Sequence, residues 1–544
     1  MPISFNNIPQ NWLQPLYWVE IDGSMAGYPM SHLRTLLVGT MTTKNTQTAL
    51  NGVGVPDTPI IVGRQMDADN LFGAGSMLAS MYRAATANNW GNEIWCLPVA
   101  ESVASVQASG TITISAPPTD AGTISLYIAG YNINVNVAAT DTANAIAQAI
   151  ADAINQEEVS FPGAIGSPPH VPVTASATAA IVTLTAKWGG VSGNEITILD
   201  SYYGRIGGEE LPPGLKITYS NPVAGTTNMG MCAGGVGTPV FTNAIANLGE
   251  TEFEYVALPY TDSTTLLAFE TEFGFGDNGR WGWMRQLYGH LFSAKRDTYS
   301  NLVTWGLTRN GKVTSVMAIE PQMPPPAYEI TACYAAKAAR ALINDPARPL
   351  QTLHLESMLP APFKSRFNLP ELNTFANSGL ATQRTLSDNV PMIARETTTY
   401  QLNLYGYGDD AFSLVTTLAT LAKLIRNQRY AITTKFPRMK LADDGTRFGA
   451  GQAIVTPSII KAELVAEYNL DMFNGLVENL AAFKAHLIVE RDPNDPNRVN
   501  VLYPPDLVNQ LRVFAVLNQF RLQYNRGVDT QIIESPVVGQ GPGL

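Results

Sequence analysis

Charged side chains are scarce in this sequence. They make up 15% of its 544 residues, whereas an average soluble protein has roughly 25%. So little charge indicates that partner subunits cover much of the surface, although a globular protein rich in glycine and alanine would have a similar composition. The formal net charge of −11 argues against nucleic acid as the main ligand, because phosphate-binding surfaces normally carry a basic excess. A local basic patch is compatible with this total.

The sequence also has few cysteines and no long apolar run. The cysteines are odd in number, far apart and set in apolar surroundings, at Cys96, Cys232 and Cys333. We therefore expect reduced thiols in a core, not disulfides or metal ligands. The first residues lack the basic start and apolar centre of a signal peptide, and no run approaches 18 apolar residues. These features predict a protein that is made and assembled in a cytoplasm without inserting into a membrane.

Convincing nucleotide, metal and catalytic motifs are missing. Gly274, Gly276 and Gly279 match G-x-G-x-x-G, but they follow an amphipathic helix instead of a strand, so no amide groups would face a pyrophosphate. The run GLTRNGK at Gly306 has Walker-like spacing, but Val313 stands where a magnesium-binding Ser or Thr is needed. A hairpin or a helix-to-strand turn explains that run better. The histidines show no ligand spacing and no catalytic triad is apparent: His32, His170, His290, His354 and His486. The sequence thus predicts no catalytic residue, metal or cofactor.

Patterns of strands and helices divide the chain into roughly three to four domains. Buried strands alternate with helices in two separate stretches, which is typical of an α/β domain with a mostly parallel sheet. Between them lies a Ser-, Thr- and Gly-rich stretch with period-two alternation. The predicted divisions are 1–28, an N-terminal arm; 29–100 and 236–394, one discontinuous α/β domain; 101–235, an inserted β-rich outer domain; 395–524, a C-terminal α+β domain; and 525–544, a C-terminal arm.

The stretch from His486 to Tyr524 is predicted to be rich in strands. Leu487–Arg491 and Arg498–Tyr503 read as strands, and the turn formers of Asp492–Asn497 join them as a hairpin. After two prolines, Arg512–Tyr524 reads as a further long strand. Because a strand near a chain end can pair with another chain, this block indicates assembly rather than catalysis.

A cluster of basic residues begins on a predicted helix at Asp410–Arg429 and continues after it. Between Ala422 and Lys440 there are six basic residues and no acid, in a chain that is acidic overall. Lys423, Arg426 and Arg429 are spaced three apart, away from the leucine stripe of the helix. They indicate either a contact surface for an acidic partner or a solvated helix end whose cations complement the helix dipole.

Several long motifs resemble the contractile tail sheath proteins of Mu-type bacteriophages. They are ARETTTYQLN at Ala394, KLADDGTRFGAGQAIVTP at Lys440, GLVENL at Gly475, VERDPNDPNRVNVLYPPDLVNQLRV at Val489 and QFRLQYN at Gln519. The resemblance extends to ISFNNIP near the amino terminus and to GGVGTP at Gly234. It implies that the C-terminal α+β domain is an inner sheath domain, and that the subunits form a helical homopolymer of stacked rings in the virion tail.

The resemblance also implies a function. The polymer would surround a tail tube, meet baseplate and tail terminator proteins, and contract once to drive the tube through the host cell envelope, without nucleotide or metal. An acidic tube surface would then be the partner of Lys423, Arg426 and Arg429. The alternative, a cytoplasmic α/β enzyme with a β-rich binding insertion, rests on fold analogy alone.

The two terminal arms are predicted to leave their own subunit. Each contains a short apolar-rich run, and turn-forming or polar sequence separates it from the domains. Added to the sheet edge of a neighbour, such runs gain main-chain hydrogen bonds. The alternative is that each folds back onto its own subunit. The residues predicted to add to a neighbour's sheet are Leu16, Tyr17, Trp18, Val19 and Ile21 in the first arm and Thr530, Gln531, Ile532 and Ile533 in the second.

Overall fold

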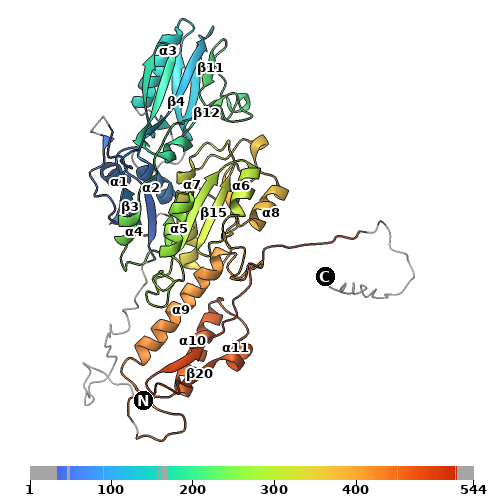
Figure 1. The fold of residues 1–544 in the computed structure, drawn as a ribbon. Coiled ribbons are helices and arrows are strands. Elements are labelled where there is room, and N and C mark those ends of the chain that lie inside the picture. Colours follow the sequence, from blue (N-terminus) through green and yellow to red (C-terminus); the bar gives the residue numbers. More distant parts are fainter. Residues whose placement is uncertain are drawn as a thin grey trace, which may run out of the picture. The chain divides into compact units, whose positions relative to one another are not determined.

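A six-stranded sheet lies at the centre of the α/β part of the protein (Figure 1). The computed structural model describes residues 33–45, 50–89, 91–156, the backbone of 159–160, 170–449, 451–520 and 522. The strand order is β15–β14–β13–β1–β3–β2, and only β2 is antiparallel to its neighbour. The strands are β1 (Thr35–Thr40), β2 (Ile60–Ile61), β3 (Ile94–Val99), β13 (Tyr255–Ala257), β14 (His290–Arg296) and β15 (Thr314–Ile319). Strands β1, β13 and β15 are buried throughout, as expected for a parallel sheet covered on both faces.

Helices connect the parallel strands. They are α1 (Gln65–Phe72), α2 (Met77–Asn88), α4 (Thr242–Ala246), α5 (Ser263–Glu272) and α6 (Tyr299–Gly306), and α7 (Ala327–Asn344) and α8 (Leu369–Asn377) follow the last parallel strand, β15. Helix α7 packs on α2, β13 and β14. Counted along the chain, the five parallel strands lie in the order 2-1-3-4-5, which is a doubly wound arrangement. The direction of winding reverses between β1 and β13, so this is the switch point of the sheet.

Two antiparallel sheets and one helix lie between β3 and α4 in the chain. One sheet has the order β12–β10–β5–β6–β7 and the other β11–β4–β9–β8. Their elements are β4 (Gln107–Ala116), β5 (Gly122–Ile128), β6 (Tyr131–Val137), α3 (Ala143–Asn155), β7 (Val159–Ser160), β8 (Val173–Thr178), β9 (Ile181–Gly189), β10 (Thr197–Asp200), β11 (Lys216–Tyr219) and β12 (Met229–Met231), with short 3-10 helices η2 (Val191–Glu195) and η3 (Arg205–Gly207). Ala129 and Gly130 have φ angles of 53° and 85°, as the two-residue turn that joins β5 to β6 requires.

The described part of the chain that follows helix α8 has three helices and small two-stranded sheets. The helices are α9 (Val415–Lys435), α10 (Pro457–Phe473) and α11 (Leu480–His486). The sheets pair β16 (Thr382–Thr385) with β17 (Pro391–Arg395), β18 (Lys440–Leu441) with β19 (Ile454–Val455), and β20 (Ile488–Arg491) with β21 (Val499–Leu502); a 3-10 helix, η4, spans Phe363–Ser365. The predicted hairpin around Asp492–Asn497 is therefore present. The structure has a mixed α/β fold with several sheets.

Two predicted elements differ in the structure. The helix predicted at Asp410–Arg429 begins at Val415 and runs on to Lys435. Residues 410–413 form a turn instead, because Thr397 pairs with Leu414 and the Asp409 carboxylate accepts a hydrogen bond from the Tyr400 hydroxyl. The strand predicted at Arg512–Tyr524 is also wrong for the single chain: residues 509–520 carry no strand. A strand needs a hydrogen-bonded partner, and none of the described residues supplies one.

A buried carboxyl group lies where the inserted sheets meet helix α7. Glu329 is 2% exposed, and its carboxyl oxygen accepts a hydrogen bond of 3.1 Å from the Tyr131 hydroxyl of β6. Burial raises the pKa of Glu329 to about 8, although the hydrogen bond from Tyr131 and the charge of Arg83 act in the opposite direction. The folded protein therefore holds this side chain protonated at neutral pH, whereas the unfolded chain ionises it.

This difference in pKa predicts how stability changes with pH. Between an unfolded pKa near 4.5 and a folded pKa of about 8, the folded state binds the extra proton, so Glu329 reduces the free energy of unfolding as pH rises, on the order of 1 kcal/mol per pH unit. Glu329→Gln keeps a neutral group and removes this loss. In urea unfolding, the free energy of unfolding of the variant relative to that of the natural protein should be higher at pH 8 than at pH 5. The exposed control Glu490→Gln should show no such change. An equal pH dependence in all three proteins contradicts the assignment.

Candidate functional site

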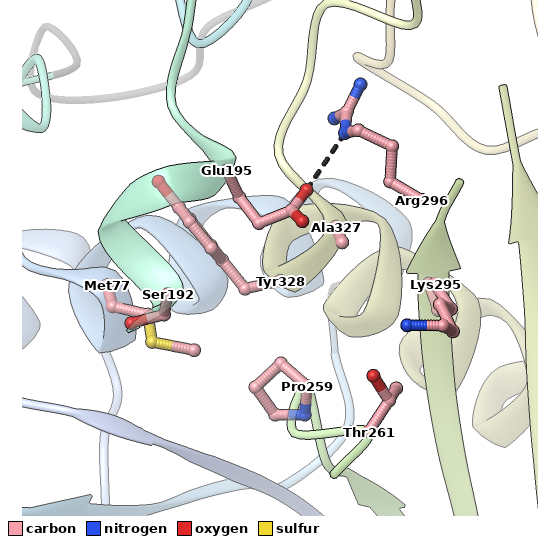
Figure 2. Close-up of a pocket in the computed structure, with 10 residues that line it drawn as sticks. Met77, Ser192, Glu195, Pro259, Thr261, Lys295, Arg296, Ala327 and Tyr328 are labelled. Carbon is pink, nitrogen blue, oxygen red and sulfur yellow. Dashed lines mark hydrogen bonds and ion pairs between the residues drawn. The ribbon is translucent and has the colours of Figure 1, made fainter. Parts of the chain in front are cut away.

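The carboxyl ends of the parallel strands are the place where an open α/β sheet usually binds its ligand. Figure 2 shows this edge, with Pro259 and Thr261 just beyond β13, Lys295 and Arg296 at the end of β14, and Tyr328 in the first turn of α7. The inserted region enters the same space, since Ser192 and Glu195 of η2 line it too.

Arg296 is the anchor of this edge. Its side chain is 4% exposed, and its Nε donates to Oε2 of Glu195 at 2.9 Å. Its two terminal nitrogens donate to the carbonyl oxygens of Pro321, Met323 and Pro325, in the loop that leads to α7. All three nitrogens of this guanidinium group thus donate inside the protein, and a group held in this way is not positioned to bind an anionic substrate as well. Arg296 therefore fixes the inserted region to the sheet.

The remaining space at this edge is too small for a metabolite. The cavity has a volume of about 60 Å³, whereas small-molecule sites typically measure about 300–1,000 Å³. At the switch point itself, the hydroxyl groups of Thr40 and Tyr260 are hydrogen-bonded at 2.7 Å, and the Tyr260 hydroxyl lies 3.6 Å from the Met77 sulfur. Side chains and the inserted region thus close the position where a related fold would hold a cofactor.

Neither glycine motif forms a phosphate cradle. Gly274, Gly276 and Gly279 lie in turns after helix α5, as their sequence context predicts. Gly311 turns the chain toward β15. The Lys312 ammonium group lies over three aromatic rings, at 4.9–5.8 Å from their centroids: Phe275, Tyr400 and Phe412. This lysine makes cation–π contacts within the protein, so the Walker-like run has a structural explanation.

The histidines and cysteines are dispersed. His290 is buried, and burial lowers its pKa to about 4, so it is neutral at physiological pH. His170 and His354 each lie beside an aspartate, at 3.9 Å and 3.4 Å, while His32 falls outside the described residues. Within the described ranges, no group of three or more His, Cys, Asp or Glu side chains is placed to hold a metal ion. All three cysteines are free and buried, as predicted.

The predicted basic cluster on α9 is divided in the structure. Lys423 and Arg429 are exposed, but the Arg426 side chain is 18% exposed and pairs with Glu254 and, at 2.7 Å, with Glu252. Arg429 also donates to the side chain of Gln286. No sequence pattern indicated these carboxylates, because they precede β13 and lie some 170 residues before Arg426 in the chain. Arg426 thus attaches α9 to the sheet.

Residues 509–520 form a separate unit of the structure with unusual exposure. Six large apolar side chains in this segment are each 57–84% exposed: Leu511, Val513, Phe514, Val516, Leu517 and Phe520. Exposed apolar residues scattered singly are ordinary, but a contiguous run marks an interaction site. Both arm strands predicted to pair with neighbours, Leu16–Ile21 and Thr530–Glu534, lie outside the described residues. None of the helices in the described part is long and apolar enough to cross a membrane.

Comparison with known proteins places this arrangement in a family. Residues 234–399 match the family model of the phage tail sheath protein central domain, and residues 408–521 match that of the phage tail sheath C-terminal domain. The Mu-like prophage FluMu tail sheath protein of Haemophilus influenzae is 38% identical over 524 residues, which cover 96% of this chain and 100% of that protein.

Solved sheath tail proteins give weaker matches. The one from Desulfitobacterium hafniense is 12% identical, with coverage of 91% of this chain and 100% of the other and a TM-score of 0.43. The one from Listeria innocua is 9% identical, with coverage of 88% and 92% and a TM-score of 0.43. The assignment rests on the two family models, which together span most of residues 234–521, and on the nearly full-length relative. The chain therefore belongs to the phage tail sheath family, and it is a structural protein of the tail, not an enzyme.

Proposed function

We propose that this sheath subunit polymerises helically around a tail tube and that the polymer contracts to drive the tube through a host envelope. The observation that carries the proposal is the run of exposed apolar side chains at 511–520, which a monomer would gain nothing by exposing. A bacterial cytoplasm is the proposed place of assembly, with tube, baseplate and tail terminator proteins as partners. Contraction would be a switch between two packings of the same subunit.

Assembly is the direct test of this function. We expect the purified full-length protein to form hollow tubes of regular helical symmetry, visible by negative-stain electron microscopy. Coexpression with the tube protein of the same phage should give sheathed tubes that are longer and narrower than the empty ones. A discrete, closed oligomer under every condition of salt and concentration would contradict the proposal.

We also propose a layered arrangement in the polymer, with residues 395–524 inside and 101–235 outermost. Support for the outer position comes from the way the inserted region is joined to the rest of the chain. Its entering and leaving segments pair with each other at Val106 and Val236, so the two chain connections to the inserted sheets lie side by side. Such a region can project outward without interrupting contacts made by the rest of the chain.

For the inner surface, we propose that Lys423 and Arg429 contact an acidic tube and that Arg426 positions the helix that carries them. Each exposed ion pair contributes only about 0.2–1 kcal/mol, but the contact repeats in every subunit. We expect Lys423→Glu with Arg429→Glu to favour empty, contracted tubes over sheathed ones. The matched control is Lys364→Glu with Arg384→Glu, which makes the same charge change at exposed residues of 236–394.

Electron microscopy of the coexpressed proteins checks this contact. The fraction of sheathed tubes should fall several-fold for the α9 variant and stay unchanged for the control. Normal sheathing by the α9 variant at both 50 mM and 500 mM salt would mean that Lys423 and Arg429 are only solvated. Arg426 is left intact because removing it would leave Glu252 and Glu254 without their partner.

The terminal arms and residues 511–520 are proposed to add strands to the C-terminal sheets of neighbouring subunits. Hairpin β20–β21 is a two-stranded sheet, so both of its edges are unpaired within the described residues. Strand addition supplies main-chain hydrogen bonds and buries alternate side chains. The residues proposed in the arms remain those around Leu16–Ile21 and Thr530–Ile533.

Proline substitutions test strand addition residue by residue. Proline removes one backbone N–H, so it disrupts a ladder only where that N–H points to the partner strand. We expect one of Val516→Pro and Leu517→Pro to abolish tube formation and the other to be tolerated, while Val516→Thr and Leu517→Thr keep the ladder and assemble. Tubes from both proline variants, or from chains lacking residues 1–24 or 527–544, would contradict strand addition. Circular dichroism confirms that each variant is folded.

A further inference from the structure

A second, larger cavity lies between the inserted sheets and the body of the protein. Its volume is about 630 Å³, well inside the range of about 300–1,000 Å³ that ligand sites occupy. One wall is a face of the five-stranded sheet, where Ser125 of β5 is paired with Asn134 of β6, and Tyr127 with Asn132. The other wall comes from loops 356–359 and 388–390. Nothing in the sheath function proposed above uses this cleft.

Some polar groups in the cleft are fixed by hydrogen bonds, and others have no hydrogen-bond partner in the described part of the chain. The Glu209 carboxylate accepts hydrogen bonds from the Tyr127 hydroxyl and, at 2.9 Å, from the backbone N–H of Tyr203. These bonds fix the loop that carries Tyr203, whose side chain lies in the wall and is 47% exposed. In contrast, the side chains of Ser125 and Asn134 have no hydrogen-bond partner among the described residues. The cleft thus offers free amide and hydroxyl groups beside a held aromatic ring.

The charge of the lining restricts the ligand. Glu209, Glu356 and Asp388 line the cleft, and the described lining residues include no lysine, arginine or histidine. Lys337 lies 3.6 Å from Glu356 and His354 lies 3.4 Å from Asp388, both outside the lining. The Glu209 carboxylate therefore disfavours phosphate, sulfate or uronic acid groups there, and no cation of the described lining would bind them. Amide groups both accept hydrogen bonds from sugar hydroxyl groups and donate to them, whereas carboxylates accept them. A tyrosine ring offers an apolar face.

We propose that this cleft binds a neutral oligosaccharide, with the Tyr203 ring packed on a sugar face and with Asn134 and Ser125 bonded to its hydroxyl groups. A peptide is less suited, because the sheet face in the wall is already paired through its main chain and presents side chains only. Many copies of the cleft on one polymer would raise a weak single-site affinity by avidity. The ligand class depends on the cleft alone and does not depend on contraction.

Affinity electrophoresis of the full-length protein in native gels tests the proposal. The gels contain one neutral polysaccharide each, namely dextran, yeast mannan or galactomannan, or the anionic alginate. We expect at least one neutral polymer to retard the protein. Tyr203→Ala and Asn134→Ala should each weaken that retardation at least tenfold. The matched control is Asn136→Ala, on the same face of β6 and outside the cleft, which should behave like the natural protein.

Three outcomes would overturn the assignment. They are no retardation by any neutral polymer, retardation by alginate alone, and retardation that Asn136→Ala reduces as much as Asn134→Ala does. Retention on an immobilised subunit of this chain, without any response to polysaccharide, would identify a second copy as the occupant instead. Because tube formation is scored separately by electron microscopy, loss of sugar binding with normal tubes separates this proposal from the proposed sheath function.

Discussion

Helix α9 belongs to two hydrophobic cores, and the relation between the sheet and the C-terminal elements depends on it. Its first half, with Val415, Leu418, Ala419 and Ala422, is part of the large core that also contains the sheet. Leu424 lies two residues further on and belongs to the second core, with Leu464, Tyr468 and Phe483. Because interiors are close-packed, neither half of the helix can shift without opening a void in one core. Arg426, paired with Glu252 and Glu254, fixes the point where the helix passes from one core to the other.

The inserted region covers the carboxyl edge of the parallel sheet, and the buried Arg296 constrains how it does so. The inserted region leaves the chain directly after β3, at the carboxyl ends of the parallel strands. Burying Arg296 there would be costly unless its guanidinium nitrogens found acceptors, and Glu195 with three carbonyl oxygens gives each of the three nitrogens at least one. The fold therefore resembles a doubly wound enzyme, yet the space of the usual ligand site is used to attach another part of the chain. Fold class alone would have pointed to the wrong function.

The sequence predicted the local elements well and the distant contacts poorly. The hairpin at Asp492–Asn497 and the buried cysteines follow from short-range rules, and they are present. The start of α9 was wrong because a pairing between Thr397 and Leu414 overrides the helical pattern. The carboxylate partners of Arg426 and Arg296 were not predictable, since they lie about a hundred residues or more away and belong to no motif. The spacing of the basic residues on α9 could not show that Arg426 is paired with carboxylates of its own chain.

The exposed segment at 511–520 shows why one chain is an incomplete unit. Its apolar residues occupy both faces of a would-be strand: Leu511, Val513 and Leu517 have one parity, and Phe514, Val516 and Phe520 the other. A surface strand of a monomer would alternate apolar with polar residues, whereas a strand covered on both faces would be apolar throughout. On the proposed function, such a strand would lie between the sheet of one subunit and the body of another. A contact made through the main chain depends little on how the bodies are oriented. The same segment could therefore hold neighbours together in both packings of the polymer.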